Sequence, residues 1–516
     1  MKQMEKWRRR GIAVLCLCLS VLLSACWQEE DPEPPELESP IPVQTAAEPE
    51  QDAASHLPDR FALPFEPNHT LDPVTCPDGM QQVVASLIYE GLFRLDPRLE
   101  PEYSLCESYT HNDDFTSYTF VLRSGVSFSD GSPLTAVEAR ASLERARESA
   151  RYRSRLRQID WMNASGNQLT ITLSVSNSGF PALLDVPICK TTGGGAPLGT
   201  GPYFYESDEY GAHLAANSIW WRGGGQPVER IELDEAQGAM IYRFTSRDVQ
   251  LIVTGLAADS PAGITGDFRY YDANTTTLHY LACNMDRWPL NVSPFRRALD
   301  RAVDRDTVAD GLFSGHAQPA QFPVSPVSTL YPADMEEDYS AADITDALSE
   351  SGWSEPERTL SLIVNAENSF KVSAARSIAA RYTAVGIPTE ARVLPWEEFQ
   401  EAIANRDFDL CYCEARLTAD WNLSPLLASW SDLNVGGWYN ERTAQLLEAY
   451  TAAGDRAGAM RTLCEHLRTM APIIPICFEN SSVLVQSAVV ENLSPTAQEP
   501  FYNLSGCTIH LREPEP

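Results

Sequence analysis

A regular alternation of strand and helix patterns between residues 360 and 413 limits the folds open to this chain. Short runs of alternating or β-branched residues predict strands, and longer stretches with apolar residues at helical spacing predict helices. In chain order these segments are a strand at 360–364, a helix at 370–385, a strand at 389–394, a helix at 397–405 and a strand at 408–413. Such a series forms a mostly parallel sheet covered by helices, so the sequence predicts an α/β fold.

Similar patterns continue through the remainder of the chain after residue 56. They predict strands at 61–65, 118–123 and 169–175, helices at 83–92 (ended by Gly91) and 136–150, and strands at 231–233 and 250–253 of one sheet. Thr135 and Glu138 have the spacing of a capping box for the helix at 136–150. A folded region of about 460 residues is too long for one compact core, so we expect two or more lobes.

A further helix is predicted at 295–313. Ser293 and Pro294 are suited to the N-cap and the first helical position. Arg296 and Asp300 are four residues apart, and we expect them to pair on the solvent-facing side of this helix.

The first 26 residues have the pattern of an export signal. Arg8, Arg9 and Arg10 precede an apolar run at 12–23, which is short for a membrane-spanning helix of about 20 residues. The run ends in Leu-Ser-Ala-Cys, which resembles the lipobox of bacterial lipoproteins. The resemblance implies that residues 1–25 are removed and that Cys26 carries a lipid. An ordinary signal peptide or a signal anchor is the alternative.

Residues 26–56 are predicted to form a disordered tether. Between residues 27 and 56 there are six prolines, nine acidic residues and no lysine or arginine. Such a segment cannot bury enough apolar surface to offset the entropy of ordering it. It would hold the folded region away from the membrane surface.

Composition and motifs exclude several functions. The formal net charge of −32 argues against nucleic-acid binding, because proteins that bind nucleic acids carry a basic face. The eight histidines show no zinc-binding spacing, and neither a G-x-S-x-G elbow nor a P-loop is present, so we expect no enzyme activity, no cofactor and no metal. The nine cysteines after Cys26 are scattered and odd in number, which does not indicate a disulfide framework, although individual pairs are left open. Cys411 and Cys413 should lie on one strand face, as buried thiols rather than as a metal site.

Several sequence blocks resemble those of family 5 bacterial extracellular solute-binding proteins, the oligopeptide and dipeptide receptors of ABC importers. In family order they are Tyr89-Glu90-Gly91-Leu92, Phe128-Ser129-Asp130-Gly131, Gly199-Thr200-Gly201-Pro202-Tyr203, Ser293-Pro294-Phe295-Arg296-Arg297 and the helix end at 348–353. The resemblance covers about residues 60–510. The segment 244–250 departs from the family pattern because it lacks the usual glycine and terminal aspartate.

The resemblance implies a bilobal class II periplasmic-binding-protein-like fold with an additional small α/β domain. It places lobe I at 57–75, 188–275 and 486–516, the extra domain at 76–187 and lobe II at 276–485. The two lobes would close over a ligand by a hinge motion.

The resemblance also implies a ligand site around Asp420. This residue matches an aspartate that pairs with the α-amino group of the peptide in oligopeptide receptors, although an aspartate that caps a loop is the alternative. Trp421 and Asn422 follow it. The preceding residues match a strand that binds the peptide backbone as an added strand; they are Arg416, Leu417 and Thr418.

Further candidate site residues follow from the same comparison. The opposing backbone would come from Gly79, Met80, Gln81 and Gln82. Trp396 and Trp438 are candidate pocket walls, with a place in the core as the alternative for each. Glu414 occupies the position at which some peptide receptors have an arginine for the far end of the ligand, so Arg416 is the candidate substitute.

The predicted function is that of a lipid-anchored receptor on the outer side of the cell membrane. It would act as a monomer, capture short peptides between its lobes and deliver them to an ABC permease made of two membrane subunits and ATPases. Within the family, nickel chelates, haem, opines and oligosaccharides are alternative ligands. A sensor or surface lipoprotein that is not coupled to transport is the alternative from another class.

Overall fold

The strand–helix series predicted at 360–413 is present in the structure. The structure is a computed structural model that describes residues 57–77, 79–223, 225–236, 238–255, 264–353 and 358–512, all within one unit, Pro49–Pro516. The series consists of β16 (Leu360–Asn365), α8 (Ser369–Ala384), β17 (Thr389–Leu394), α9 (Trp396–Ala404) and β18 (Leu410–Arg416). Because β16 pairs in parallel with both β17 and β18, the predicted parallel sheet is confirmed. The predicted signal peptide, the tether and Cys26 lie outside the described residues.

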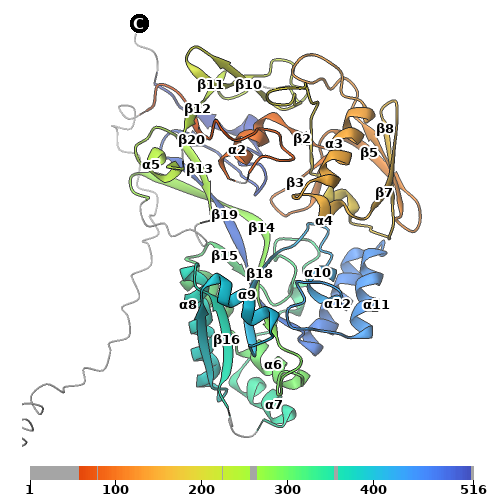
Figure 1. The fold of residues 1–516 in the computed structure, drawn as a ribbon, viewed down its shortest axis with the longest axis vertical. Helices are drawn as coiled ribbons and strands as arrows, with labels where there is room; N and C mark the ends of the chain where they lie inside the picture. Colours follow the sequence, from red (N-terminus) through yellow and green to blue (C-terminus); the bar gives the residue numbers. More distant parts are fainter. Residues whose placement is uncertain are drawn as a thin grey trace, which may run out of the picture. The chain divides into compact units, whose positions relative to one another are not determined.

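This series belongs to a seven-stranded sheet, which we call the long sheet. Its order is β13-β19-β14-β18-β16-β17, with β15 paired to β19. The strands not yet given are β13 (Leu251–Thr254), β14 (Phe268–Cys283), β15 (Ala317–Pro319) and β19 (Ile473–Gln486). The long antiparallel pair of β14 and β19 runs between the region that contains α2 and the region that contains α8 (Figure 1).

The two halves of this pair lie in different hydrophobic cores. Val483 and Val485 pack in a core with the N-terminal strand and helix of the described chain. Leu278 and Phe478 pack in a second core, together with residues of β18 and of the last two helices. The β14–β19 pair is therefore a covalent and hydrogen-bonded connection between separately packed regions.

A four-stranded sheet, called here the first sheet, lies in the N-terminal region. Its order is β1 (Ala62–Phe65), β12 (Arg230–Glu235), β11 (Gly211–Ala216) and β10 (Tyr203–Asp208). The expectation that the strands near 231 and 250 share a sheet is wrong, because β13 pairs with β19 of the long sheet. Gln250 still connects the two sheets, since Ala62 N donates to its Oε1 atom at 2.7 Å.

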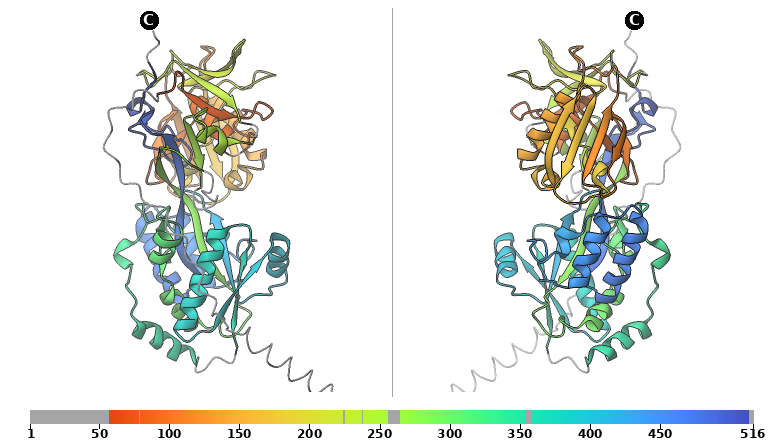
Figure 2. Two further views of the ribbon diagram at one scale, coloured as in Figure 1. Left: turned by 90° about the vertical axis from the view of Figure 1, so that its left-hand side faces the viewer. Right: turned by 90° about the vertical axis from the view of Figure 1, so that its right-hand side faces the viewer.

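A second four-stranded sheet is antiparallel and carries a helix on one face (Figure 2). It consists of β5 (Cys106–His111), β6 (Ser117–Leu122), β8 (Gln168–Leu173) and β7 (Ile159–Ser165), and α3 (Ala136–Glu148) packs against β7 and β8. The predicted capping box of Thr135 and Glu138 is confirmed at the start of α3. This second sheet has a hydrophobic core of its own.

The remaining described elements connect or cover these sheets. They are α2 (Met80–Ile88), β2 (Glu90–Gly91), β3 (Phe93–Leu95), β4 (Pro101–Tyr103), α4 (Arg153–Leu156), η2 (Phe180–Leu183), β9 (Pro187–Ile188), α5 (Met240–Thr245), α6 (Ser293–Ala302), η3 (Thr307–Leu312), η4 (Ala333–Met335), α7 (Ala341–Ser351), α10 (Ser424–Leu427), α11 (Glu441–Thr451), α12 (Arg456–Met470), β20 (Val490–Glu491), η5 (Leu504–Gly506) and β21 (Thr508–Ile509).

Two predicted helices have wrong boundaries. The first was expected at 83–92, but α2 spans Met80–Ile88 and Gly91 pairs with Pro187 in a short antiparallel ladder. A Cβ atom on Gly91 would lie 2.6 Å from the carbonyl oxygen of Phe93, so this glycine permits a close backbone approach rather than ending a helix.

The second wrong boundary lies after residue 293. The expected helix at 295–313 is divided into α6 and the π-helical turn η3, with Val292 rather than Ser293 at the N-cap. Arg296 is only 2% exposed and donates to the carbonyl oxygens of Ala471 and Leu290, so its expected position on the solvent face is wrong. Asp300 pairs with Arg305 instead.

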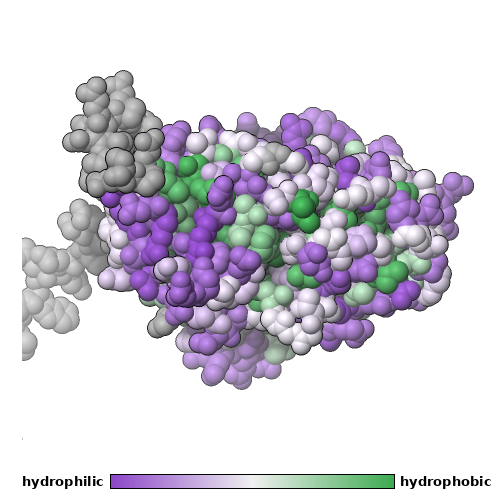
Figure 3. All heavy atoms as spheres, turned by 90° about the horizontal axis from the view of Figure 1, so that it is seen from above, coloured by the Kyte–Doolittle hydropathy of each residue, from purple (hydrophilic) through white to green (hydrophobic). Residues whose placement is uncertain are grey.

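The surface of the molecule and the state of its cysteines agree with what the composition of the sequence predicts. The face at the β10–β12 end shows mostly hydrophilic atoms with separate apolar patches (Figure 3). All nine cysteines of the described residues are buried and none of them forms a disulfide, and the sulfur atoms of Cys411 and Cys413 lie 3.4 Å apart on one strand face, as predicted. Among the described residues, no helix has the length and apolar character needed to cross a bilayer.

Candidate ligand-binding site

Strand β18 has one paired edge and one edge that is open near its end. β14 pairs along β18 as far as Arg416, whereas β16 pairs only with Leu410 and Cys411. Leu417 N donates to Thr276 O, so the backbone groups of Leu417 point toward β14. Because backbone groups of successive strand residues point to opposite edges, those of Arg416 point to the other edge. Among the described strands, none pairs with that edge beyond Cys411. Thr418 lies after the end of β18, and its carbonyl oxygen accepts from Trp421 N at 2.9 Å in a turn.

Asp420 follows this open edge as a buried carboxylate. It is 2% exposed. Its Oδ1 atom accepts from the Thr418 hydroxyl at 2.5 Å and from the Asn422 amide at 3.3 Å. Its Oδ2 atom accepts from Asn177 Nδ2 at 2.9 Å. Asn177 lies between β8 and η2, so one acceptor of this carboxylate faces the region of the second sheet.

The last two long helices hold the backbone of Asp420. The Tyr450 hydroxyl donates to its carbonyl oxygen at 2.7 Å, and Arg456 Nη2 donates to the same atom at 2.6 Å. These two bonds fix the loop between β18 and α10, and the carboxylate therefore has a defined direction.

Asn177, Tyr450 and Arg456 were not predicted from the sequence. Asn177 is 243 positions from Asp420, and no motif connects the two residues. Only the packing of the second sheet against this loop brings them together.

The surroundings of Asp420 also contain arginines. Burial lowers the pKa of Arg155 to about 10, the charge of Asp420 opposes that shift and the charge of Arg416 adds to it. Arg155 forms an ion pair with Asp185. Arg416 is exposed and has no ion-pair partner among the described residues. It is thus the predicted site residue with a positive charge that a ligand carboxylate can reach.

Glu414 is already paired. It lies on β18, two residues before Arg416, and forms an ion pair with Lys371 in the first turn of α8. Burial by itself raises the pKa of Glu414, but the hydrogen bond and charge of Lys371 outweigh it and hold the pKa below its usual value.

The two residues after Asp420 have structural contacts. Trp421 is 1% exposed, has a φ of 51° and packs edge-on against Phe478 with ring centroids 5.8 Å apart. Its indole Nε1 is buried and has no hydrogen-bond partner among the described residues. Asn422 accepts from Ser424 N at 3.0 Å and so begins α10.

The two candidate wall tryptophans differ in exposure. Trp438 is 7% exposed, belongs to a hydrophobic core and donates to the Thr443 hydroxyl at 3.2 Å. Trp396 is 49% exposed at the first position of α9, where it stacks on Phe399. Trp396 is therefore the one that a ligand could contact without a change in the core.

The predicted opposing segment forms the start of α2. Gly79 is the N-cap with a φ of 83°, and Met80 is the first helical residue. Gln81 is 1% exposed, and its side-chain amide both accepts from and donates to the backbone of Glu66. Gln82 donates to the sulfur of Cys76. The side chains of both glutamines thus hold the loop before α2.

A separate pocket lies away from the predicted ligand residues, beside the helices α6, α7 and α12. Its volume is about 260 Å³, and its lining side chains are Arg297, Asp300, Arg301, Glu337, Tyr339, Glu350, Arg468 and Thr469. The charges are mutually paired, as in Arg297–Glu350 and Arg468–Glu337. It contains none of the predicted ligand residues.

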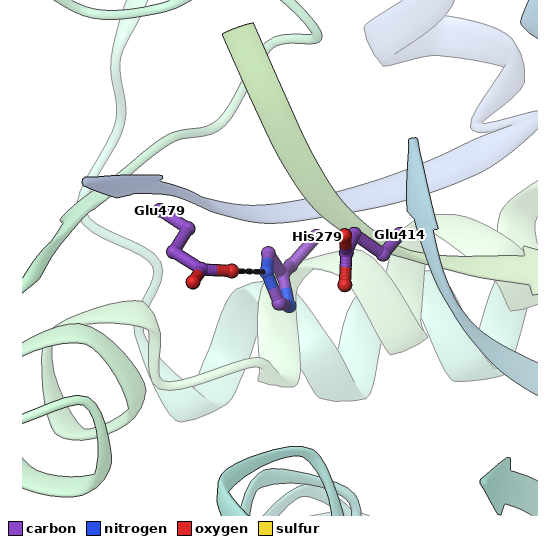
Figure 4. Close-up of side chains that lie close together, drawn as sticks. All are labelled: His279, Glu414 and Glu479. Carbon is purple, nitrogen blue, oxygen red and sulfur yellow. Dashed lines mark hydrogen bonds and ion pairs between the residues drawn. The ribbon is translucent and has the colours of Figure 1, made fainter. Parts of the chain in front are cut away.

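One cluster of potential metal ligands is present in the part of the chain that the structure describes. One ligand atom each of His279, Glu414 and Glu479 lie within 4.8 Å of one another. The three residues come from β14, β18 and β19, so neighbouring strands of the long sheet bring them together (Figure 4).

Comparison with known proteins identifies the family of this chain. The family model for bacterial extracellular solute-binding proteins, family 5, matches residues 100–432, which span both the second sheet and the Asp420 loop. The chain belongs to this family. The predicted resemblance is confirmed, and the family consists of solute-binding proteins rather than enzymes.

Relatives in this family have the same fold. The glutathione-binding protein GsiB of Salmonella typhi is 26% identical over 392 residues, covering 70% of this chain and 76% of GsiB. The unliganded open form of the periplasmic murein tripeptide binding protein MppA has a TM-score of 0.74 and 17% identity, with 88% of this chain and 97% of MppA covered. A nickel ABC transporter structure from Bacillus halodurans has a TM-score of 0.70 and 22% identity, covering 88% and 99%. The predicted bilobal family fold is thereby confirmed.

Proposed function

We propose that this family 5 protein captures short peptides at the end of β18 and delivers them to an ABC permease. The observation that supports this most directly is the open edge of β18 at Arg416, four residues before the buried carboxylate of Asp420. Such an edge can accept the backbone of an extended peptide, and the carboxylate can accept its α-amino group. Backbone recognition tolerates varied side chains.

The carboxyl end of the peptide would be recognised by a positive charge on the protein. Glu414 is paired with Lys371, whereas Arg416 is exposed on the same strand. We therefore propose Arg416 for the ligand carboxylate. Trp396, with half of its side chain exposed, is the proposed contact for a ligand side chain.

The named ligands of two relatives agree with this class. GsiB is a glutathione-binding protein and MppA binds murein tripeptide, and both ligands are short peptides. The structure named as a nickel ABC transporter represents the alternative, a metal chelate. A peptide with a free α-amino group would use both the strand edge and the carboxylate of Asp420.

We also propose a division into lobes that follows the separate cores. Lobe I would contain residues 57–75, 188–275 and 486–516, as expected from the sequence, and also α2, because α2 packs in the core of the first sheet together with Phe501 and Cys507. The extra domain would follow α2 and contain the second sheet as far as residue 187, and lobe II would contain residues 276–485. The chain would act as a monomer anchored to the membrane through a lipid on Cys26.

The ligand class can be tested by native mass spectrometry of the freshly purified protein. We expect a heterogeneous set of co-purified short peptides. A single sugar or metal chelate would contradict the proposal.

The role of Asp420 can be tested with Asp420→Asn, which keeps the size and one of the two acceptor oxygens but removes the charge. Because a buried charge partner is lost, we expect peptide affinity measured by calorimetry to fall by roughly 2–5 kcal/mol. The matched control is Asp432→Asn, since Asp432 is exposed in a nearby loop and should leave affinity unchanged. Equal affinity of Asp420→Asn and the parent protein would remove Asp420 from the site.

A further inference from the structure

A buried histidine lies between two carboxylates in the long sheet, and nothing proposed above for peptide binding uses it. His279 is 0% exposed, and the Glu479 side chain is 11% exposed. Glu414, on the other side of the imidazole, is 37% exposed. Figure 4 shows the imidazole between the two carboxylate side chains. No sequence motif indicates this cluster, because the three residues are spread over 200 positions.

The geometry of the cluster suits a single bound ion. His279 Nε2 and Glu479 Oε2 are 2.9 Å apart. Two ligand atoms that each lie about 2.1 Å from one tetrahedral ion are separated by roughly 3.4 Å. Glu414 supplies a third atom, and one nitrogen of His279 and one carboxylate oxygen of each glutamate lie within 4.8 Å of one another, so the three side chains would have to move closer together to bind one ion.

The second nitrogen of His279 has a suitable partner. Nδ1 lies 3.1 Å from the hydroxyl oxygen of Tyr412 on β18. A metal-bound imidazole normally donates its other N–H to an oxygen, which fixes the ring orientation. The tyrosine hydroxyl both donates and accepts, so it can support either tautomer of His279. A metal on Nε2 would leave the ring proton on Nδ1, where it can be donated to the Tyr412 hydroxyl oxygen.

The charge of the cluster favours a cation. The cluster contains two carboxylates, and of these Glu414 forms an ion pair with Lys371 whereas Glu479 lies against His279. Lys371 lies in the first turn of α8 with its side chain 22% exposed, and its flexible stem can turn toward solvent. The ammonium thus already pairs with the carboxylate of Glu414 that a metal ion would use.

We propose that His279, Glu414 and Glu479 bind one divalent transition-metal ion of the Zn²⁺ class, in competition with the ammonium group of Lys371. One imidazole nitrogen and two carboxylate oxygens are a common ligand type for such ions, and water would complete the coordination. Ca²⁺ fits less well, because it takes six to eight oxygen ligands. The site does not depend on the proposed peptide function and is tested without peptide.

The test is a titration of the chelator-treated protein, without the predicted signal peptide, with Zn²⁺ in a calorimeter. We expect one site per chain. Glu479→Gln and His279→Gln each remove a ligand and should weaken binding by at least about tenfold. Lys371→Met removes the competing ammonium and should bind Zn²⁺ more tightly than the parent protein. A purely structural ion pair would give no such gain.

The controls separate metal binding from folding. His316→Gln breaks a similar histidine–carboxylate pair, His316–Asp272, which has no third ligand, and should leave Zn²⁺ affinity unchanged. If His279→Gln does not fold, as shown by circular dichroism, the partly exposed Glu414→Gln replaces it, with the same expected loss. No saturable Zn²⁺ binding by the parent protein and by Lys371→Met would overturn the proposal, and so would unchanged affinity in the ligand variants.

Discussion

At the scale of single residues, the Glu414–Lys371 pair sets the acid–base behaviour of β18. Burial raises the pKa of Glu414, but the adjacent ammonium lowers it by more, to below its usual value of 4.5. A carboxyl whose pKa is lower in the folded than in the unfolded protein stabilises the fold when ionised. The stabilisation is complete above the unfolded pKa and is lost as the pH falls through the folded pKa.

Lys371→Met is therefore expected to destabilise the protein only at a pH above that range. At pH 7 the difference in the free energy of unfolding should be below about 1 kcal/mol, because the pair is partly exposed. It should shrink toward zero as the pH falls below 4.5 and Glu414 is protonated. Urea unfolding at a series of pH values, with a chelator present, measures this difference in the free energy of unfolding. A difference that persists at pH 2 would mean that the lysine contributes through packing alone.

For Asp420, the sequence predicts the position in the chain but not the residues that contact it. Its position after β18 followed from a local motif that resembles the family pattern. Its hydrogen bond from Asn177 and the contacts of its carbonyl with Tyr450 and Arg456 come from segments far apart in the chain. A motif carries no information about such partners, because their proximity depends on how separate sheets pack.

At the scale of elements, α3 is a case in which local signals determine the outcome. Thr135 caps the helix through Val137 N, and Glu138 returns a bond to the backbone of Thr135. Both interactions are formed within four consecutive residues, so the sequence alone predicts where α3 begins.

Thr135→Ala is expected to lower the free energy of unfolding by about 1 kcal/mol, because it leaves N–H groups of the first turn without their side-chain partner. Denaturant unfolding followed by circular dichroism gives the value. The control is Val137→Ala in the same turn, where the side chain is 54% exposed and contributes little. Equal stability of Thr135→Ala and the parent protein would show that tertiary packing alone holds this end of α3.

The two wrong helix boundaries have non-local causes. Residues of α2 and Gly91 share an apolar run, but Gly91 leaves the helix because its backbone pairs with Pro187, almost a hundred positions later. Arg296 lies at a helical spacing that suits a solvent-facing pair, yet its guanidinium is buried on the carbonyl oxygens of Ala471 and Met470 at the C-terminal end of α12. Local periodicity cannot anticipate a buried charge whose acceptors come from a distant turn.

At the scale of the whole molecule, the β14–β19 pair joins regions with separate cores. Two strands that pass between two cores allow the regions to move as units, which is the arrangement expected of a receptor that closes over a ligand. The lipid proposed for Cys26 would keep this receptor close to its permease.

Cys26→Ser is expected to abolish that attachment, because a hydroxyl group cannot replace the thiol that receives the lipid. When the full chain is expressed in a bacterial host, the parent protein should partition with the membrane fraction and the detergent phase. The variant should lose the lipid mass and move to the soluble exported fraction, unless an uncleaved signal still holds it. Detergent-phase partition of the parent without any lipid mass on Cys26 would contradict the proposal.

The sequence by itself determined the family, the parallel series from β16 to β18, the capping box of α3 and the location of Asp420. These features depend on neighbours a few residues apart, on periodicity or on motifs. Only the tertiary structure decided which sheet receives β13, which residues hold Asp420 in place, and that His279, Glu414 and Glu479 meet. Strand order and side-chain convergence are set by contacts between segments some 200 residues apart, and a linear pattern does not encode these contacts directly.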